Sequence, residues 1–523
     1  MNTFTNPILS GFRPDPSICR VGEDYYLVTS SFAYFPGLPV YHSRDLVHWE
    51  QIGHAIDRPG QLDYRNCEVK EGLWAPTIRH HDGVWYIVNT LVSDHYQSWR
   101  NFILTARDPA GPWSDPVFLD GLGGIDPSLF FGADGALWYL GSDAQEPSAY
   151  PGHNILYLQP LDRTTFQPAG ERHILLDGAD FHGNWIEAPH LYEHDGWYIL
   201  IFAEGGTYRD HSVMAARSRA LTGPYELCPR NPIVTHRHLP YQSELSVVGH
   251  ADLVETQNGD WWAALLAVRP YEGGGYTLGR ETCLLPMDWS EDGWPMAASR
   301  DGLVHRRERA PRLPETFLPL PCPADSFEAP TLGPVWNTIH PSSEPFWSLS
   351  ARPGCLRLSL RPETLEASGA TPAFVGRRQE HRLCLAVTAM DFTPQTAGEE
   401  AGLALFADCE YHFLLCKALH EGREALQLWQ TEAGVRTLLA EQTVTPGARL
   451  YLAAQCNRSR YVLSWGHRPD RLTPLAEVNA DLLSTTTNGG FTGTYFGLYA
   501  SANGAPSSNH ADFDWFSYHG IDI

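Results

Sequence analysis

Short runs rich in Val, Ile, Leu, Tyr, Trp and Phe follow one another along most of the chain, and polar turn residues separate them. The turns include the segments His81–Gly83, Ala133–Gly135, His194–Gly196 and Gln257–Asp260. Such runs are typical of β-strands, and turns containing Gly and Asn are typical of the connections between them. No long segment has the apolar period of an amphipathic helix. The pattern therefore predicts an all-β protein.

Five related phrases recur in the first part of the chain. Each leads from a start containing Pro or Ala into a strand, a turn and a second strand rich in aromatic residues. Their alignment places one set of residues at the same position, with spacings of 60, 51, 62 and 62 residues: Asp15, Ala75, Asp126, Ala188 and His250. A period of about 50–60 residues with about four strands per unit is typical of a propeller blade. We therefore predict a five-bladed β-propeller over residues 1–305; a pair of β-sandwiches with coincidental repeats is the alternative.

The second part of the chain has a different character. The segment Arg306–Phe327 holds five prolines, which predicts an extended linker over residues 306–325. Regularly spaced short strands then resume as far as the last residue. Such a series over residues 326–523 predicts a jelly-roll-like β-sandwich domain.

The net charge of the chain disfavours some classes of binding partner. The formal net charge is −24, from 61 acidic and 37 basic residues. Nucleic-acid binders usually have the opposite balance, and an anionic membrane surface is disfavoured for the same reason. No run of about 18 apolar residues is present, so no membrane span is expected. A neutral partner such as a sugar fits better, and the 17 tryptophans suit contacts with flat sugar rings.

Cysteine usage and the first residues bear on the compartment. The ten cysteines are scattered and form no CxxC motif, which disfavours zinc and redox sites and fits a reducing compartment. The N-terminal residues show no basic segment followed by an apolar core, the signature of a secretory signal peptide. A cytoplasmic protein is therefore expected.

Three acidic residues occupy equivalent places in the repeat. Asp15 and Asp126 lie at the aligned position of the first and third units, and Glu187 lies one residue before it in the fourth. The first strand of a propeller blade lines the central channel, so these side chains should converge at one mouth. Clustered carboxylates repel one another and raise one another's pKa values. This repulsion is tolerated at active sites, where catalysis uses the raised pKa values. Glycoside hydrolysis needs one protonated and one ionised carboxyl group, and a third can keep the pKa of the acid high. A non-catalytic carbohydrate-binding propeller is the alternative from another functional class.

The motifs around these acids resemble a known family. The stretches "FRPDPSICRVGEDYYLV", "GIDPSLFF", "IEAPHLY", "GHADLVE" and "LGRET" are similar to those of glycoside hydrolase family 43, in the group of β-xylosidases and α-L-arabinofuranosidases with a C-terminal β-sandwich. The resemblance covers essentially the whole chain. It implies an inverting mechanism with Asp15 as general base, Asp126 as pKa modulator and orienting residue, and Glu187 as general acid.

The resemblance also implies substrate-binding residues. Arg280, in "LGRET", matches the arginine that reaches substrate hydroxyl groups and Asp126. Phe32 and Trp74 resemble the aromatic walls of the subsite for the terminal sugar. Thr207 follows two glycines that place flexible backbone beside the pocket. His250 should lie deep on the channel axis, where it is either a hydrogen-bonded core residue or a neighbour of a structural or activating Ca²⁺. The expected reaction requires no cofactor.

In the group that this sequence resembles, a loop of the sandwich domain places an aromatic side chain over the mouth of the propeller. The segment "GGFTGTYFGLY", from Gly489, resembles that loop and makes Phe491 or Tyr495 the candidate, unless both belong to the sandwich core. A pocket closed on one side accepts only a chain end. The sequence therefore predicts an exo-acting β-D-xylosidase on xylo-oligosaccharides, with α-L-arabinofuranosidase or dual activity as the alternative. By resemblance alone, a homodimer or homotetramer is also expected.

Overall fold

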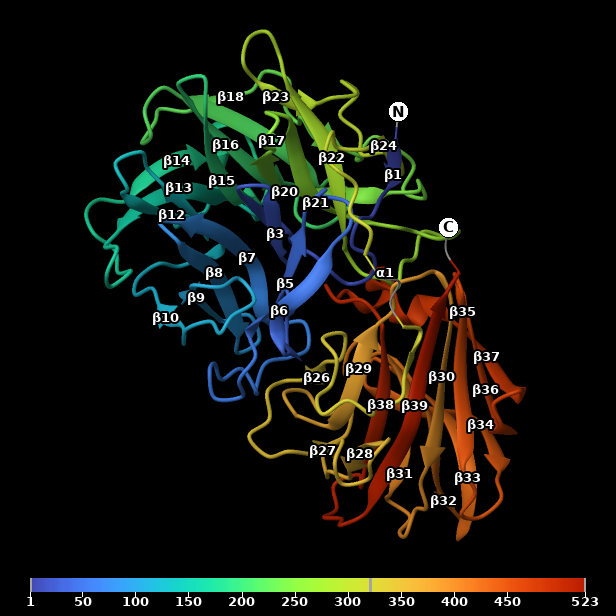
Figure 1. Cartoon of the computed structure of the whole chain (residues 1–523). Coiled ribbons are helices and arrows are strands. Elements are labelled where there is room, and N and C mark those ends of the chain that lie inside the picture. Colours follow the sequence, from blue (N-terminus) through green and yellow to red (C-terminus); the bar gives the residue numbers. More distant parts are fainter. Residues whose placement is uncertain (1, 319–321, 522–523) are drawn as a thin grey trace.

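Five antiparallel sheets follow one another along residues 17–297 of the computed structural model, which describes residues 2–318 and 322–521 (Figure 1). Each sheet is one blade. The blades are, in order, β2 (Ser17–Val21), β3 (Asp24–Val28), β5 (Gly37–Ser43) and β6 (Glu50–Ile56); β7 (Gly72–His81), β8 (Val84–Ser93), β9 (Ser98–Ala106) and β10 (Val117–Phe118); β11 (Ile125–Phe131), β12 (Leu137–Ala144), β13 (Asn154–Leu161) and β14 (His173–Asp177); β15 (Glu187–His194), β16 (Trp197–Glu204), β17 (Ser212–Ser218), β18 (Glu226–Leu227) and β19 (Val234–Thr235); and β20 (Ser246–Glu255), β21 (Trp261–Val268), β22 (Glu281–Trp289) and β23 (Pro295–Ala297).

Buried apolar clusters join each blade to the next and close the ring. Four of them lie between successive blades, with Val40 against the second blade and Ile201 against the fifth as examples. In the remaining cluster, Leu27 of the first blade packs with Ala264 of the fifth. Burial of these faces is the main force that holds the blades together. The prediction of a five-bladed propeller is confirmed, and the alternative of two sandwiches is wrong.

The segment predicted as a linker begins and ends in strands. β1 (Thr3–Thr5) pairs with β24 (Arg307–Arg309), so the start of residues 306–325 is tied to the N-terminal strand of the propeller. β25 (Ala324–Asp325) pairs with the last strand of the chain, β39 (His510–Gly520). Residues 319–321 lie outside the described residues, as do residues 1, 522 and 523.

The C-terminal domain is a sandwich of two antiparallel sheets, drawn below the propeller in Figure 1. One sheet contains β25, β27 (Trp347–Ser348), β28 (Leu356–Ser359), β39, β30 (Leu383–Asp391), β35 (Leu450–Asn457), β36 (Arg460–Arg468) and β37 (Arg471–Asn479); the other contains β29 (Ala373–Arg378), β38 (Tyr495–Ser501), β31 (Glu400–Phe406), β32 (His412–His420), β33 (Arg423–Glu432) and β34 (Val435–Thr443). Their facing side chains form one large buried cluster that includes Leu403, Leu452 and Phe513. The prediction of a β-sandwich is confirmed.

Helical structure is minor. It consists of η1 (Gly178–Asp180), η2 (Ala480–Leu483) and α1 (Thr485–Asn488). Over residues 2–318 and 322–521, none of these is long and apolar enough to cross a bilayer.

The two domains share both backbone pairing and a core. β4 (Tyr34–Phe35) of the propeller pairs with β26 (Thr338–Ile339), which precedes the sandwich strands. A buried apolar cluster joins Phe12 and Phe32 to Phe374 and Tyr495 across the boundary. The propeller mouth beside Phe32 is therefore built against the sandwich and is not a free surface.

The aligned residue of every repeat has the same unusual backbone. The φ angles of Asp15, Ala75, Asp126, Ala188 and His250 are 54°, 40°, 54°, 52° and 53°. Left-handed backbone costs a residue other than glycine about 1–2 kcal/mol. In four blades this residue lies inside a β-bulge of the innermost strand. Bulges re-aim a side chain and are frequent beside active sites.

Candidate active site

A cavity of about 270 Å³ lies at the mouth of the propeller channel. It is lined by Asp15, Phe32, Trp74, Ala75, Ile125, Asp126, Trp185, Glu187, Gly206, Thr207, Tyr208, His250, Arg280 and Phe491. Nine of the ten residues predicted from the sequence are in this set; Tyr495 is not. Pockets for drug-sized ligands usually measure about 300–1,000 Å³, so this cavity suits a smaller group such as one sugar unit.

The three acids reach the cavity from the starts of innermost strands. Asp15 lies two residues before β2, Asp126 is the second residue of β11, and Glu187 is the first residue of β15. The left-handed backbone at Asp15, Asp126 and Ala188 repeats the same change of direction in three blades. The repeat thus brings carboxyl groups that are more than 50 residues apart in sequence around one small space.

Asp15 is held by hydrogen bonds to both of its oxygens. Arg280 donates from Nη1 to Oδ1, and Ser30 donates from Oγ to Oδ2 over 2.6 Å. Ser30 Oγ in turn accepts from the backbone N–H of Ala75 over 2.7 Å, so the second blade supports the acid of the first. Only 4% of Asp15 is exposed. This arrangement fixes the orientation of the carboxylate toward the cavity.

The other two acids hold their protons unusually strongly. Burial raises the pKa of Asp126 to about 6, and the negative charge of Asp15 adds to this rise, against the opposing effects of His250, the Ala188 N–H and Arg280. Burial raises the pKa of Glu187 well above its ordinary value, and the negative charges of Asp126 and Asp15 raise it further. Of the two, Glu187 therefore suits the role of a group that is still protonated near neutral pH.

His250 lies between two of the acids. Its Nδ1 is 4.0 Å from Asp15 Oδ1 and 3.9 Å from Asp126 Oδ2. Ca²⁺ takes about six to eight oxygen ligands. Here Arg280 already pairs with Asp15, and the Ala188 N–H donates to Asp126. Within the described ranges, no group of three or more His, Cys, Asp or Glu side chains could hold a metal ion. The donor set near His250 does not fit Ca²⁺.

Aromatic side chains form one wall, and the sandwich contributes to it. Ring centroids are 5.5 Å apart both between Phe32 and Trp74 and between Trp74 and Phe491. Phe491 lies after α1, in the loop that leads to β38. A sandwich residue therefore lines the propeller cavity.

Tyr495 is a correction to the sequence-based expectation. It is the first residue of β38 and is fully buried. Its ring stacks on Tyr34 with a centroid distance of 3.9 Å and an interplanar angle of 12°. The side chain is thus part of the interdomain core, because strand alternation at β38 directs it against β4 and away from the cavity.

Comparison with known proteins agrees with this geometry. A sequence model of glycosyl hydrolases family 43 matches residues 4–295. The chain belongs to glycosyl hydrolases family 43. A model described as the β-xylosidase C-terminal concanavalin A-like domain matches residues 324–519. The family-43 resemblance noted from the motifs is confirmed, and the protein is a glycoside hydrolase. The alternative of a non-catalytic binding propeller is wrong.

Relatives of this family-43 enzyme align along nearly their full lengths. It is 40% identical to a xylosidase/arabinosidase of Butyrivibrio fibrisolvens, with 98% of each chain covered. It is 38% identical to a non-reducing end α-L-arabinofuranosidase of Bacteroides ovatus, over 99% of this chain and 95% of the relative. The solved structure of a xylan β-1,4-xylosidase from Bacillus halodurans superposes with a TM-score of 0.92 at 35% identity, covering 98% of this chain and 99% of that one.

Two aromatic residues of the cavity were not found from the sequence of this family-43 chain. Trp185 and Tyr208 are 42% and 53% exposed and belong to loops that precede β15 and follow β16. Gly206 sits beside Trp185: a Cβ there would lie 3.2 Å from Trp185 Cε3. The two glycines at 205 and 206 mark this loop in the sequence and point to Thr207, but they do not indicate which aromatic side chains reach the cavity.

A second polar layer lies beneath the acids. Residues two positions after the aligned set belong to the innermost strands: Ser17, Thr77, Ser128, His190 and Asp252. Asp252 accepts from Ser17 Oγ over 2.6 Å and from Arg79 Nη1 over 2.8 Å. Arg79 Nη2 and Ser128 Oγ both lie 2.9 Å from His190 Nδ1. These contacts link the innermost strands of all five blades of the family-43 domain through one polar network.

Proposed function

We propose that the enzyme is an inverting exo-glycosidase that releases terminal β-D-xylosyl units from xylo-oligosaccharides. The names of several relatives support the sugar, including the xylosidase/arabinosidase of Butyrivibrio fibrisolvens. A second activity, α-L-arabinofuranosidase, is supported by the relative from Bacteroides ovatus, which carries that name. One cavity can serve both sugars because xylopyranose and arabinofuranose can present similar hydroxyl positions.

The observation that carries the proposal is the contrast between two carboxyl groups at one cavity. Glu187 has its pKa raised well above the ordinary range by burial and by two neighbouring acids. It is therefore suited to deliver a proton to the leaving oxygen as general acid. Asp15 accepts hydrogen bonds from Arg280 and Ser30, which orients it to take a proton from water as general base. Asp126 supplies negative charge beside Glu187 and so keeps the proton on the acid.

Inversion and exo-action are the finer parts of the proposal. An inverting enzyme delivers water from the base to the face of the sugar opposite the leaving group. Phe491 of the sandwich and the wall of Phe32 and Trp74 bound the cavity on one side, which favours binding of a chain end.

We assign no step to a metal, because the donors around His250 do not suit Ca²⁺. Treatment with EDTA should therefore leave the rate unchanged. Loss of activity that Ca²⁺ restores would contradict this.

Compartment and assembly complete the proposal. Eight cysteines form no disulfide bond, which supports a reducing compartment such as the cytoplasm: Cys19, Cys67, Cys228, Cys283, Cys322, Cys355, Cys409 and Cys416. A homodimer or homotetramer rests on family resemblance. Light scattering after size-exclusion chromatography tests it, because a species at the chain mass of 58.4 kDa would contradict it.

Replacement of Glu187 by Gln tests the assignment of the acid. We expect kcat on aryl β-D-xylopyranosides with poor leaving groups to fall by about 10²–10⁴-fold, because general-acid help is lost. An activated leaving group needs little protonation, so its aryl glycoside should lose much less. Equal losses on both kinds of leaving group would contradict the role of Glu187.

The same enzyme preparation tests the sugar and the stereochemistry. Wild-type rates on aryl β-D-xylopyranoside and aryl α-L-arabinofuranoside rank the two activities. Proton NMR of the first product should show α-xylose before mutarotation. An initial β-anomer would contradict inversion.

A further inference from the structure

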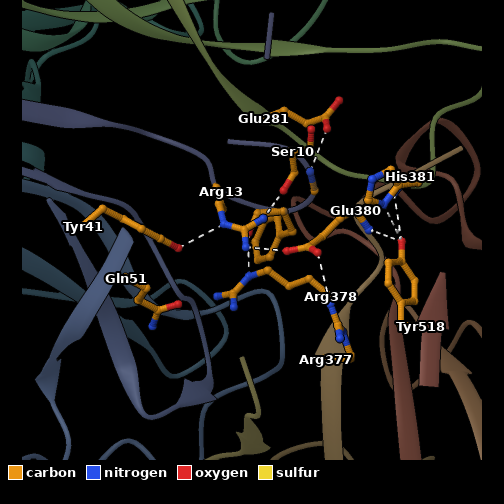
Figure 2. Close-up of polar contacts among 12 residues, drawn as sticks. Ser10, Arg13, Tyr41, Gln51, Glu281, Arg377, Arg378, Glu380, His381 and Tyr518 are labelled. Carbon is orange, nitrogen blue, oxygen red and sulfur yellow. Dashed lines mark hydrogen bonds and ion pairs between the residues drawn. The ribbon is translucent and has the colours of Figure 1, made fainter. Parts of the chain in front are cut away.

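A buried ion pair joins the sandwich to the segment that carries the base. Glu380, two residues after β29, accepts from Arg13 Nη2 through Oε1 over 2.6 Å (Figure 2). Its other oxygen accepts from Arg377 Nη2 over 3.1 Å. The side chains of Arg13 and Glu380 are only 11% and 20% exposed. Arg13 also donates to Tyr41 Oη over 3.0 Å and to the Ser10 carbonyl, so its guanidinium is held from three directions.

The backbone of the same segment is fixed by the fifth blade and the sandwich. The N–H of Arg13 donates to the Arg280 carbonyl over 3.0 Å, which places the base segment in register with the arginine that contacts Asp15. The N–H of Gly11 donates to Glu281 Oε1 over 2.7 Å. From the sandwich, Arg378 Nε donates to the Phe12 carbonyl over 2.8 Å.

Gly11 shows how closely the sandwich approaches this segment. Its φ is +78°, and a Cβ at this position would lie 2.6 Å from the Gln379 carbonyl oxygen and 3.2 Å from Glu380 Cα. A side chain would therefore push the sandwich backbone away. The close approach is what allows Glu380 to reach Arg13.

Asp15 needs such support because its backbone is strained. Its φ of 54° lies in the left-handed region that aspartate adopts only at a cost. Sparsely populated backbone persists where the surrounding contacts over-determine it. Arg13 is two residues away, and its side chain forms the ion pair of this segment with the sandwich.

We propose that Glu380 is a positioning residue for the base Asp15, acting through Arg13. The sandwich then has a part in the reaction beyond the contribution of Phe491 to the cavity wall. The inference rests on the proposed role of Asp15 as the general base. The charged groups that face Asp15 are Arg280, His250, Asp126 and Glu187, and all four belong to the propeller.

Three variants test the proposal on the full-length enzyme. In Glu380→Ala, kcat should fall by about 10–10²-fold with KM changed by less than about threefold, because the loss is one of alignment in the transition state. Glu380→Gln, which can still accept from Arg13, should recover part of the loss. Tyr271→Phe is the matched control: it removes the 2.6 Å hydrogen bond from Tyr271 to Asp481, another contact between the domains, and should keep the wild-type kcat and KM.

Each contrary result has a distinct meaning. An unchanged kcat with a lowered Tm in Glu380→Ala would make the ion pair purely structural and overturn the proposal. Failure of Glu380→Gln to recover any of the lost kcat would make the effect one of charge alone, without the hydrogen bond to Arg13, and would overturn it as well. If Glu380→Ala fails to fold, the double variant Arg13→Met with Glu380→Leu removes both charges of the pair and leaves only Arg377 without its carboxylate partner. It should fold and keep the low kcat, and wild-type kcat would refute positioning.

The proposed function fails separately, if the wild type hydrolyses neither aryl glycoside. A crystal structure of Glu380→Ala then decides the inference. Separation of Asp15 from Arg280 would support it, and an unchanged pair with unchanged backbone at Asp15 would overturn it.

Discussion

Asp126 carries a charge in a place that disfavours it. It is 7% exposed and faces Asp15, and its pKa of about 6 means that the folded protein binds a proton there more tightly than the unfolded chain does. An ordinary aspartate has a pKa of about 3.9. The folded state is therefore not penalised below about pH 4, and the penalty reaches its full size of about 3 kcal/mol above about pH 6. The negative charge of Asp126 also raises the pKa of Glu187. The charge that destabilises the fold therefore helps to keep Glu187 protonated.

Asp126→Asn separates these two effects. Its Tm should exceed that of the wild type at pH 8 and equal it at pH 4, because only the ionised carboxylate destabilises the fold. Its kcat should fall, and the alkaline limb should move to lower pH, since Glu187 loses a negative neighbour. Calorimetry at the two pH values and a pH–rate profile are the measurements. Equal Tm values at pH 8 would show that the burial of this charge is not costly.

The innermost strand is the element that organises the site. Residues of this strand serve both layers: His250 lines the cavity, and Asp252, two positions later, belongs to the buried network with Arg79. Burial lowers the pKa of His190 to about 3, which keeps this ring neutral beside Arg79. This network forms a polar floor below the acids, in which the Asp252 side chain is fully buried and that of Arg79 is 15% exposed.

Asp252→Ala tests the importance of that floor. Asp252 is fully buried, and its removal leaves Arg79 unpaired, which costs about 3–5 kcal/mol when one partner of a buried pair is lost. We expect a corresponding loss in the free energy of unfolding, measured with urea. Glu23→Ala, at a residue with a 71% exposed side chain at the β2–β3 turn, is a control that should change little. A loss below 1 kcal/mol, on the scale of an exposed ion pair, would contradict this account.

The same strands explain what could be predicted from the sequence. Asp15, Asp126, Glu187 and His250 could be placed together because the repeat marks the strand that lines the channel. Trp185 and Tyr208 could not, because loops between strands have no register that fixes their direction. Phe491 and Tyr495 are four residues apart and both aromatic, and the start of β38 at Tyr495 is what distinguishes the wall residue from the core residue. The contact of Arg13 with Glu380 spans 367 residues and leaves no local pattern.

At the scale of the whole molecule, the two domains act as one enzyme. A shared apolar cluster, the pairing of β4 with β26 and the ion pair of Glu380 all lie at the boundary beside the cavity. Independent domains usually meet through smaller and more polar contacts. A propeller produced alone would expose Phe12, Phe32 and Tyr34 and would lack Phe491.

Separation of the domains tests this unity. Residues 2–316 alone should aggregate or show at least about 10²-fold lower kcat than the full chain, because both alignment and the cavity wall are lost. The control is the full chain with a protease site inserted after Glu315 and cleaved after folding; it should keep its activity, since the interface holds the halves together. An active isolated propeller would show that the sandwich is dispensable.

The distance along the chain between Asp15 and Phe491 has a consequence for biosynthesis. The ribosome makes Asp15 long before Phe491, and β39, which pairs with β25 and β30, follows later still. A nascent or prematurely terminated chain therefore carries all three acids without a competent site. Truncation before Phe491 would remove this part of the cavity wall together with β38 and β39, so a chain shortened in this way should be inactive.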